Sequence, residues 1–212
     1  MRGLYAIVDV TTLERRQLSV LEVVRALVRA RPAALQLRAK DLAPREVLHL
    51  LRAIHPICRE AGVPLFANDR PDLAVLSGCE GVHIGQSDLP LAVVRRIAPG
   101  LRIGISTHTL EQVESAIADR PDYVAFGPVF DTRSKPDHED VVGLDRLRAV
   151  AARCPVPVVA IGGIDLDRAH DVAQATRLGA VIGALLPDAD EPSDLGTITR
   201  RACALHSALA SA

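Results

Sequence analysis

"GVHIGQSDLPLAVVRRIAPGLRIGIS", residues 81–106, contains one full unit of the pattern that decides the fold. The apolar runs at 81–85 and 102–106 predict β-strands, and the apolar residues of 90–98 recur at helical spacing. Glycine and proline lie between these elements, where they interrupt regular structure. Because a helix joins the two strands, the strands are expected to be parallel and the crossover right-handed.

The same alternation continues in both directions along the chain. Strands are predicted at residues 4–9, 34–39, 65–69, 81–85, 102–106, 123–129, 157–163 and 179–185. Amphipathic stretches between them predict helices, among them 20–30, 45–62, 110–119, 144–153 and 165–175.

Eight strand–helix units of roughly 25 residues each are typical of a small (β/α)8 barrel (TIM barrel). No linker-like or low-complexity segment divides the sequence, so we predict one α/β barrel domain over residues 1–212. The alternative is a doubly wound open sheet. That fold usually carries a glycine-rich nucleotide motif after its first strand, and neither G-x-G-x-x-G nor a Walker loop follows residues 4–9.

Composition excludes several classes of function. The net charge is −1 with both signs mixed along the chain, which argues against nucleic-acid and membrane-surface binding. Aromatic residues make up 2%, too few for stacking on single-stranded nucleic acid. The widely spaced Cys58, Cys79, Cys154 and Cys203 form no C-x-x-C pair, so we expect buried free thiols. With no signal peptide or membrane span, the expected location is the cytoplasm.

The stretch "ALQLRAKD", residues 34–41, alternates in polarity. Gln36, Arg38 and Lys40 lie on one face of the predicted strand, and Leu35 and Leu37 lie on the other. In a barrel the polar face would point inward near the carboxyl ends of the strands, where active sites lie. Buried charges need partners, so a pocket for an anion explains this face. The alternative is a set of internal salt bridges with barrel carboxylates.

Two carboxylates follow neighbouring strands at the same edge of the barrel. Asp69 ends the "FAND" strand, and Asp88 lies in the "GQSD" loop after the next one. Mg²⁺ takes one or two carboxylates and completes its coordination with substrate phosphate oxygens, so we expect this pair to bind magnesium. The alternative for each residue is a helix N-cap.

Later strands end in further polar or glycine-rich segments. Ser106 and His108 share one side of their strand, and Thr132, Ser134 and Lys135 form a loop able to wrap a phosphate or to remain solvated. Gly162-Gly163 and Ile182-Gly183 follow the last two strands, where many barrels bind phosphate through backbone N–H groups. The sequence thus predicts two anion sites, one suited to a diphosphate and one to a monophosphate.

These motifs resemble the thiamine-phosphate synthase (thiamine-phosphate pyrophosphorylase) family. The similar segments are "LQLRAK", "NDRPDLAVLSGCEGVHIGQSDLP", "GISTHT", "DYVAFGPVFDTRSKP" and "VVAIGGI", in family order along the chain. The resemblance implies a barrel enzyme that joins a hydroxymethylpyrimidine diphosphate to a thiazole phosphate and releases pyrophosphate. The implied partners are thus two phosphorylated small molecules, and a homo-oligomer stays open.

The resemblance also implies roles for individual residues. Those implied for the pyrimidine diphosphate are Gln36, Arg38, Lys40, Asn68, Ser106 and Lys135, of which Arg38, Ser106 and Lys135 are the implied catalytic residues. Those implied for the thiazole phosphate are Thr132, Arg133, Ser134, Gly163, Ile182 and Gly183. Asp69 and Asp88 match the Mg²⁺ ligands. Gly183 stands where the family usually has serine, so its backbone N–H remains and a hydroxyl is lost.

The implied mechanism is dissociative, with cations stabilising the leaving pyrophosphate. It needs no side-chain nucleophile, and we expect a pocket without a poised Ser–His pair. Two alternatives remain. A related thiazole tautomerase shares a histidine at the position of His108 and would not need the carboxylate pair. A non-catalytic protein that binds a phosphorylated metabolite would need neither the pair nor Lys135.

Overall fold

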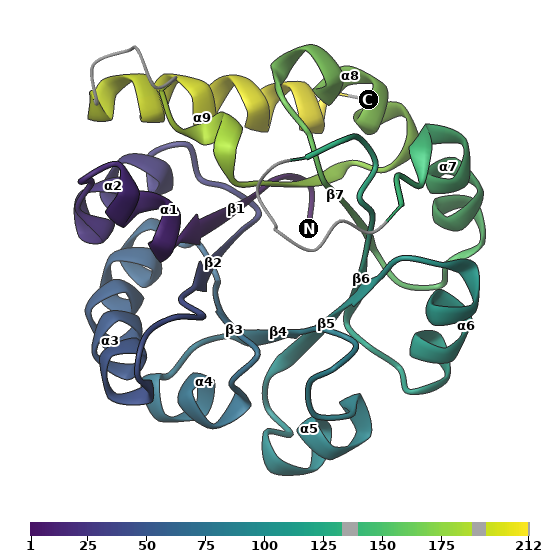
Figure 1. Cartoon of the computed structure of the whole chain (residues 1–212), viewed down its shortest axis with the longest axis horizontal. Coiled ribbons are helices and arrows are strands. Elements are labelled where there is room, and N and C mark those ends of the chain that lie inside the picture. The colour runs from purple at the N-terminus through teal and green to yellow at the C-terminus, as the bar shows by residue number, and fades with distance from the viewer. Residues whose placement is uncertain (133–139, 188–193, 212) are drawn as a thin grey trace.

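The strands of this protein close into a barrel in which each neighbouring pair is parallel. The computed structural model describes residues 1–132, 140–187 and 194–211. Within these ranges the strands pair in chain order, and the last pairs with the first (Figure 1). They are β1 (Gly3–Asp9), β2 (Ala34–Arg38), β3 (Leu65–Asn68), β4 (Gly81–Ile84), β5 (Arg102–Thr107), β6 (Tyr123–Phe126), β7 (Val158–Ile161) and β8 (Leu178–Val181). The predicted (β/α)8 barrel is confirmed.

Helices surround the barrel on its outside (Figure 1). The main ones are α2 (Val20–Val28), α3 (Pro44–Ala61), α4 (Pro71–Ser77), α5 (Leu91–Ile97), α6 (Leu110–Ala118), α7 (Gly143–Arg153), α8 (Leu166–Ala175) and α9 (Leu195–Ala210). A short α1 (Val10–Arg15) follows β1, and a 3₁₀ turn, η1 (Gly183–Leu185), follows β8. Helix α9 packs against α2, α8 and β1, so it covers the seam between the first and last strands.

Three strands end two or more residues before their apolar runs predict. The predictions 123–129, 157–163 and 179–185 continue past the observed ends at Phe126, Ile161 and Val181. The apolar residues that follow are buried in loops and in η1, as Val129, Ile164 and Leu185 show. Apolar character there reflects burial of a connection and not strand structure.

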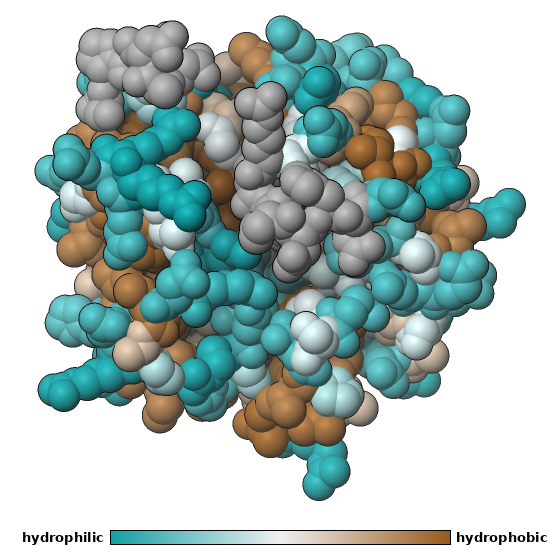
Figure 2. Space-filling model, in the orientation of Figure 1, coloured by the Kyte–Doolittle hydropathy of each residue, from teal (hydrophilic) through white to brown (hydrophobic). Residues whose placement is uncertain are grey.

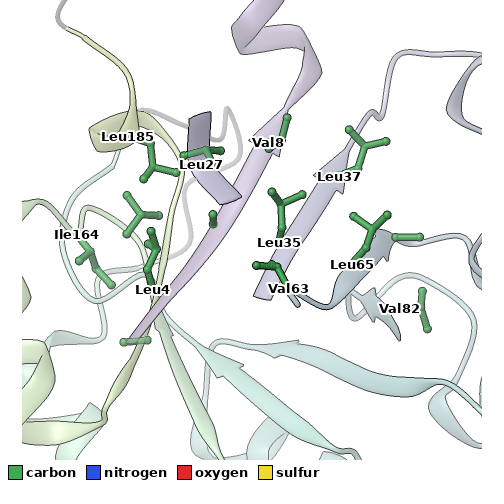
Figure 3. Close-up of a cluster of buried hydrophobic side chains, with 14 of the residues drawn as sticks. Leu4, Val8, Leu27, Leu35, Leu37, Val63, Leu65, Val82, Ile164 and Leu185 are labelled. Atoms are coloured by element: carbon green, nitrogen blue, oxygen red, sulfur yellow. The ribbon is translucent and has the colours of Figure 1, made fainter. Parts of the chain in front are cut away.

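Alternate residues of the strands face two separate cores. Leu35 and Leu37 point outward and pack in the layer between strands and helices, together with Leu4 and Leu27 (Figure 3). The inward residues of the same strands form a second cluster inside the barrel. The predicted division of β2 into an apolar outer face and a polar inner face is therefore correct.

Three aromatic rings fill the barrel interior. The ring centroids of Tyr5, Phe66 and Tyr123 lie 5.7 to 5.8 Å apart. Strand pairing places a glycine beside two of them, Gly81 opposite Phe66 and Gly104 opposite Tyr123. A Cβ at Gly104 would lie 1.9 Å from the Tyr123 ring. These glycines are needed because the neighbouring rings occupy their side-chain space.

The carboxylate of Asp9 joins three elements at the end of β1. Asp9 is 5% exposed and is the N-cap residue of α1. Its Oδ1 accepts hydrogen bonds from the backbone N (2.9 Å) and the hydroxyl (2.6 Å) of Thr12. Its Oδ2 pairs with the guanidinium of Arg38, opposite it in β2. Burial alone would raise the pKa of Asp9, but the bonds from Thr12 and Arg38 outweigh it, so the pKa lies below its ordinary value of 3.8.

The four cysteines differ in how far they are buried. All four cysteines are free; Cys58 and Cys79 are buried, Cys154 is half-buried and Cys203 is exposed. The expectation of burial is wrong for Cys203, because α9 turns Ala202 and Leu205 inward instead.

Among the described residues, none of the helices has the length and apolar character needed to cross a membrane.

The contact between Gly104 and Tyr123 yields a stability prediction. We expect Gly104→Ala to lower the free energy of unfolding by about 1–3 kcal/mol, because the ring must shift within a filled interior. Gly100→Ala is the control, since a Cβ there meets nothing within 4 Å. Urea denaturation of the two variants measures both effects. Equal stability of the two variants would contradict the packing argument.

The ion pair of Asp9 predicts a pH-dependent stability. A carboxyl whose folded pKa is depressed stabilises the fold above its unfolded pKa, and this contribution is lost as the pH falls through the folded value. We expect Asp9→Asn to cost about 1–3 kcal/mol at pH 7, because Arg38 loses its charged partner. The difference from the unmodified protein should shrink as the pH falls below 3.8. Unfolding free energies measured from pH 7 to pH 3 test this; a constant difference would contradict it.

Candidate active site

A cavity of about 580 Å³ opens at the carboxyl ends of the strands. Its floor includes Tyr5 and Tyr123, and its walls carry polar side chains from β1 to β5. On the face seen in Figure 2, hydrophilic side chains gather over β1 and β2 near the middle of the barrel. This is the end of a (β/α)8 barrel at which active sites form.

The polar face of β2 borders this cavity. Gln36 is buried and its Nε2 donates to Oδ1 of Asn68 at 2.7 Å. Arg38 pairs with Asp9, and the Nζ of Lys40 lies 3.3 Å from Oδ2 of Asp69. The predicted inward orientation is observed, and so are the salt bridges that were its alternative. The anion pocket and the salt bridges are compatible, because Arg38 and Lys40 line the cavity while paired and can also contact a ligand there.

Asp69 and Asp88 converge beside Lys40. Asp69 follows β3 with a left-handed backbone (φ 62°), and Asp88 accepts a hydrogen bond from the N of Gly85 at 2.6 Å. The capping alternative is wrong for both, since Arg70 and Pro90 are the N-cap residues of α4 and α5. Burial raises the pKa of Asp69, the nearby Asp88 carboxylate adds to this, and Lys40 opposes it. A cation between the two carboxylates would relieve their repulsion.

This donor set fits a magnesium ion that is shared with a ligand. Within the described ranges no three His, Cys, Asp or Glu side chains form a metal-binding group. A transition-metal cage therefore has no support among those residues. Magnesium commonly takes one or two protein carboxylates and completes its shell with water and phosphate oxygens, which Asp69 and Asp88 could accommodate.

Ser106 has an unexpected partner. Its Oγ lies 2.9 Å from Nε2 of His83, whose Nδ1 lies 2.9 Å from Oη of Tyr123. The expectation of a pocket without a Ser–His pair is therefore wrong. The alternation of β4 carries the signal that was missed, because His83 shares the inward face of the strand with Gly81. Its other ring nitrogen contacts a phenol and not a carboxylate, so the arrangement is not a Ser–His–Asp triad.

His108 also borders the cavity, with one defined ring nitrogen. Its Nδ1 lies 2.6 Å from the carbonyl oxygen of Gly127, which can only accept, so Nδ1 carries a proton. In the neutral imidazole Nε2 is then an acceptor. Its backbone N donates to Oε1 of Gln112 at 2.7 Å, which ties the residue after β5 to the first turn of α6.

The predicted monophosphate site is only partly described. Arg133, Ser134 and Lys135 lie outside the described residues. Of the others, Ile182 lines the cavity, whereas Thr132, Gly163 and Gly183 are not among its described lining residues.

Gly163 has a structural reason of its own for being glycine. Its backbone is left-handed (φ 64°), and a Cβ would lie 2.4 Å from the carbonyl oxygen of Asp131. Gly183 is exposed and begins η1, so its backbone stands at the end of β8.

The structure adds wall residues that the sequence did not single out. Asp9 and Arg15 come from β1 and α1, and Gln86 comes from the loop after β4. Gln86 donates from Nε2 to the carbonyl oxygen of Ser106 at 2.6 Å, which ties this loop to β5. Asp9 is the last residue of β1, and Asp69 directly follows β3. Its position at the end of a strand could therefore have identified Asp9 as a wall residue.

Comparison with known proteins identifies the family. A family model described as thiamine monophosphate synthase matches residues 4–185. The thiamine-phosphate synthase of Roseiflexus sp. (strain RS-1) is 38% identical over 209 residues, covering 98% of this chain and 85% of that protein. That of Roseiflexus castenholzii is 42% identical over 177 residues, covering 81% of this chain and 78% of that protein.

A solved structure agrees with these relatives. The thiamine phosphate pyrophosphorylase from Pyrococcus furiosus superposes with a TM-score of 0.84 at 31% identity, covering 98% of this chain and 95% of the other. Sequence and fold therefore agree over nearly the whole barrel. The chain belongs to the thiamine monophosphate synthase family of transferases.

Proposed function

We propose that this chain forms thiamine phosphate by joining a hydroxymethylpyrimidine diphosphate to a thiazole phosphate, with release of pyrophosphate. The observation that carries the proposal is the convergence of Gln36, Arg38 and Lys40 with Asn68 and Asp69 on one cavity wall. The names of the relatives, thiamine-phosphate synthase, support the same reaction.

The cations of β2 suit the diphosphate. Arg38 is held in place by Asp9 and presents the rest of its planar guanidinium to the cavity, a geometry suited to phosphate oxygens. Lys40 is 53% exposed at its side chain, so it can turn from Asp69 toward a ligand. Lys135, from the segment outside the described residues, is proposed as a third cation on the diphosphate.

The amide pair of Gln36 and Asn68 suits the pyrimidine. Gln36 Nε2 donates to Asn68, which leaves Gln36 Oε1 and Asn68 Nδ2 as an acceptor and a donor at the wall. An aminopyrimidine offers an amino donor and ring-nitrogen acceptors that match them. Thr132, Arg133, Ser134 and the backbone of Gly163, Ile182 and Gly183 are proposed for the thiazole phosphate.

Magnesium at Asp69 and Asp88 would supply positive charge to the leaving diphosphate oxygens. The residues of this chain would do the rest. Arg38, Lys40 and Lys135 stabilise charge on the leaving group as the C–O bond breaks, and the wall amides hold the pyrimidine ring. The thiazole nitrogen then captures the pyrimidinylmethyl cation, so no side-chain nucleophile is required.

The geometry of His108 favours a second candidate. With Nδ1 donating to Gly127, its Nε2 can accept a proton at the cavity, as the thiazole tautomerase alternative needs. A non-catalytic phosphometabolite-binding protein is the third. Neither alternative requires the Asp69–Asp88 pair, which is what separates them from the synthase.

The proposed reaction is tested with purified protein, both substrates and Mg²⁺, by oxidising the product to fluorescent thiochrome. We expect product that disappears on addition of EDTA. We expect Asp69→Asn to lower the rate on the order of 100-fold or more, because a ligand charge is lost while asparagine tolerates the left-handed backbone.

Asp41→Asn is the matched control. Asp41 lines the same cavity but accepts from Thr11 Oγ1 at 2.6 Å, away from the carboxylate pair. Equal rates for the two variants would remove Asp69 from the metal site. No product from a folded protein that binds thiazole phosphate would favour the tautomerase, and His108→Ala would then be the variant to assay.

A further inference from the structure

A continuous chain of hydrogen bonds runs from the barrel interior to the cavity. Oη of Tyr5 lies 2.8 Å from Oη of Tyr123, which lies 2.9 Å from Nδ1 of His83. Nε2 of His83 lies 2.9 Å from Oγ of Ser106. The four side chains come from β1, β6, β4 and β5, and all are buried. The distances do not show which atom of each pair is the donor. The surroundings of Tyr5, at the inner end of this series of hydrogen bonds, decide it.

The inner end is the Tyr5 phenol. Burial raises the pKa of both tyrosines, so each phenol keeps its proton. Among the residues that the structure describes, Tyr123 Oη is the hydrogen-bond partner of Tyr5 Oη. The side chains of Phe66 and Arg102 lie nearby, and a guanidinium cannot accept a hydrogen bond. Tyr5 must therefore donate to Tyr123, because a buried donor without an acceptor is costly.

The donor in each of the other two hydrogen bonds follows from this one. The Tyr123 proton is directed to His83 Nδ1, which therefore accepts. Neutral His83 then carries its proton on Nε2 and donates it to Ser106. A protonated imidazole would put a second donor on the Tyr123 oxygen and leave the Tyr123 proton without an acceptor. The Ser106 hydroxyl proton is consequently left to point into the cavity that Ser106 lines.

We propose that Tyr5, Tyr123 and His83 are positioning residues that fix Ser106 as a hydrogen-bond donor to an acceptor atom of the substrate. An unprotonated nitrogen of a heteroaromatic ring is the matching group. The identity of that ring, the pyrimidine, rests on the proposed function, whereas the proton position on His83 does not.

A bond donated to a ring nitrogen withdraws electron density from the ring. It therefore helps to bind and orient the pyrimidine but does not stabilise a developing cation on it. Breaking this series of hydrogen bonds should therefore raise KM for the pyrimidine substrate more than it lowers kcat.

The proton position on His83 can be observed directly. Two-bond ¹H–¹⁵N correlation spectra of protein labelled with ¹⁵N-histidine distinguish the two neutral imidazole forms, and loss of one signal set in His83→Gln gives the assignment. We expect the proton on Nε2. In Tyr123→Phe, which keeps the ring stacked on His83 but removes its donor, we expect a shift toward the Nδ1-protonated form. A proton on Nδ1 in the unmodified protein would overturn the proposal.

Kinetics test the consequence for the substrate. Tyr123→Phe and Tyr5→Phe should each raise KM for the pyrimidine diphosphate about three- to tenfold, with smaller changes in kcat. KM for the thiazole phosphate should not change. Thr107→Val is the matched control, because it deletes a buried hydroxyl from the residue next to Ser106 that donates instead to the Ala125 carbonyl at 2.9 Å.

The outcomes separate the two proposals. If the unmodified protein makes product and both tyrosine variants keep its KM values, the positioning role is wrong. If the unmodified protein makes no product, the proposed function fails, and the NMR experiment still decides the direction of the chain. Should Tyr123→Phe not fold, Tyr5→Phe removes only the innermost donor and is read by the same two measurements.

Discussion

The packing of aromatic rings against glycines inside the barrel is the constraint on which the site depends. Phe66 and Tyr123 each lie beside a glycine of the neighbouring strand, and Tyr5 contacts both rings. Together they fill the lower part of the barrel interior. Because the filling ends at the level of the tyrosine hydroxyls, the upper part stays open as the cavity. One packing arrangement thus provides both the stability of the barrel and the floor of its binding site.

The cations of the cavity are stabilised in two ways. Arg38 and Lys40 each have a carboxylate partner, Asp9 and Asp69, which offsets the cost of removing charge from water. The two pairs differ in exposure: Asp9 is nearly inaccessible, whereas the side chain of Lys40 is half exposed. Arg38 is therefore a fixed element of the wall, and Lys40 is free to exchange one oxygen partner for another. This division suits a site that must hold an anion and then release it.

The sequence predicted the barrel and the polar part of the cavity wall on β2 and after β3, because these follow from local periodicity. Alternation along β2 is enough to orient Gln36, Arg38 and Lys40, and a strand end is enough to place Asp69. The hydrogen-bond chain through His83 was missed because it joins four strands, and its partners depend on register that no local pattern encodes. Strand ends near Phe126 and Val181 were misplaced because buried connections are as apolar as strands.

The packing of α9 over the barrel seam has a consequence for how the barrel folds. Strand β8 pairs with β1, and α9 packs over that seam against α2 and α8 (Figure 1). The contacts that close the ring therefore join residues far apart in the sequence, so they form late and at a high cost in loop entropy. Until these contacts form, β1 and β8 are open strand edges with unpaired backbone groups. Closure of the ring therefore also removes the two edges through which a partly folded barrel could pair with another chain and aggregate.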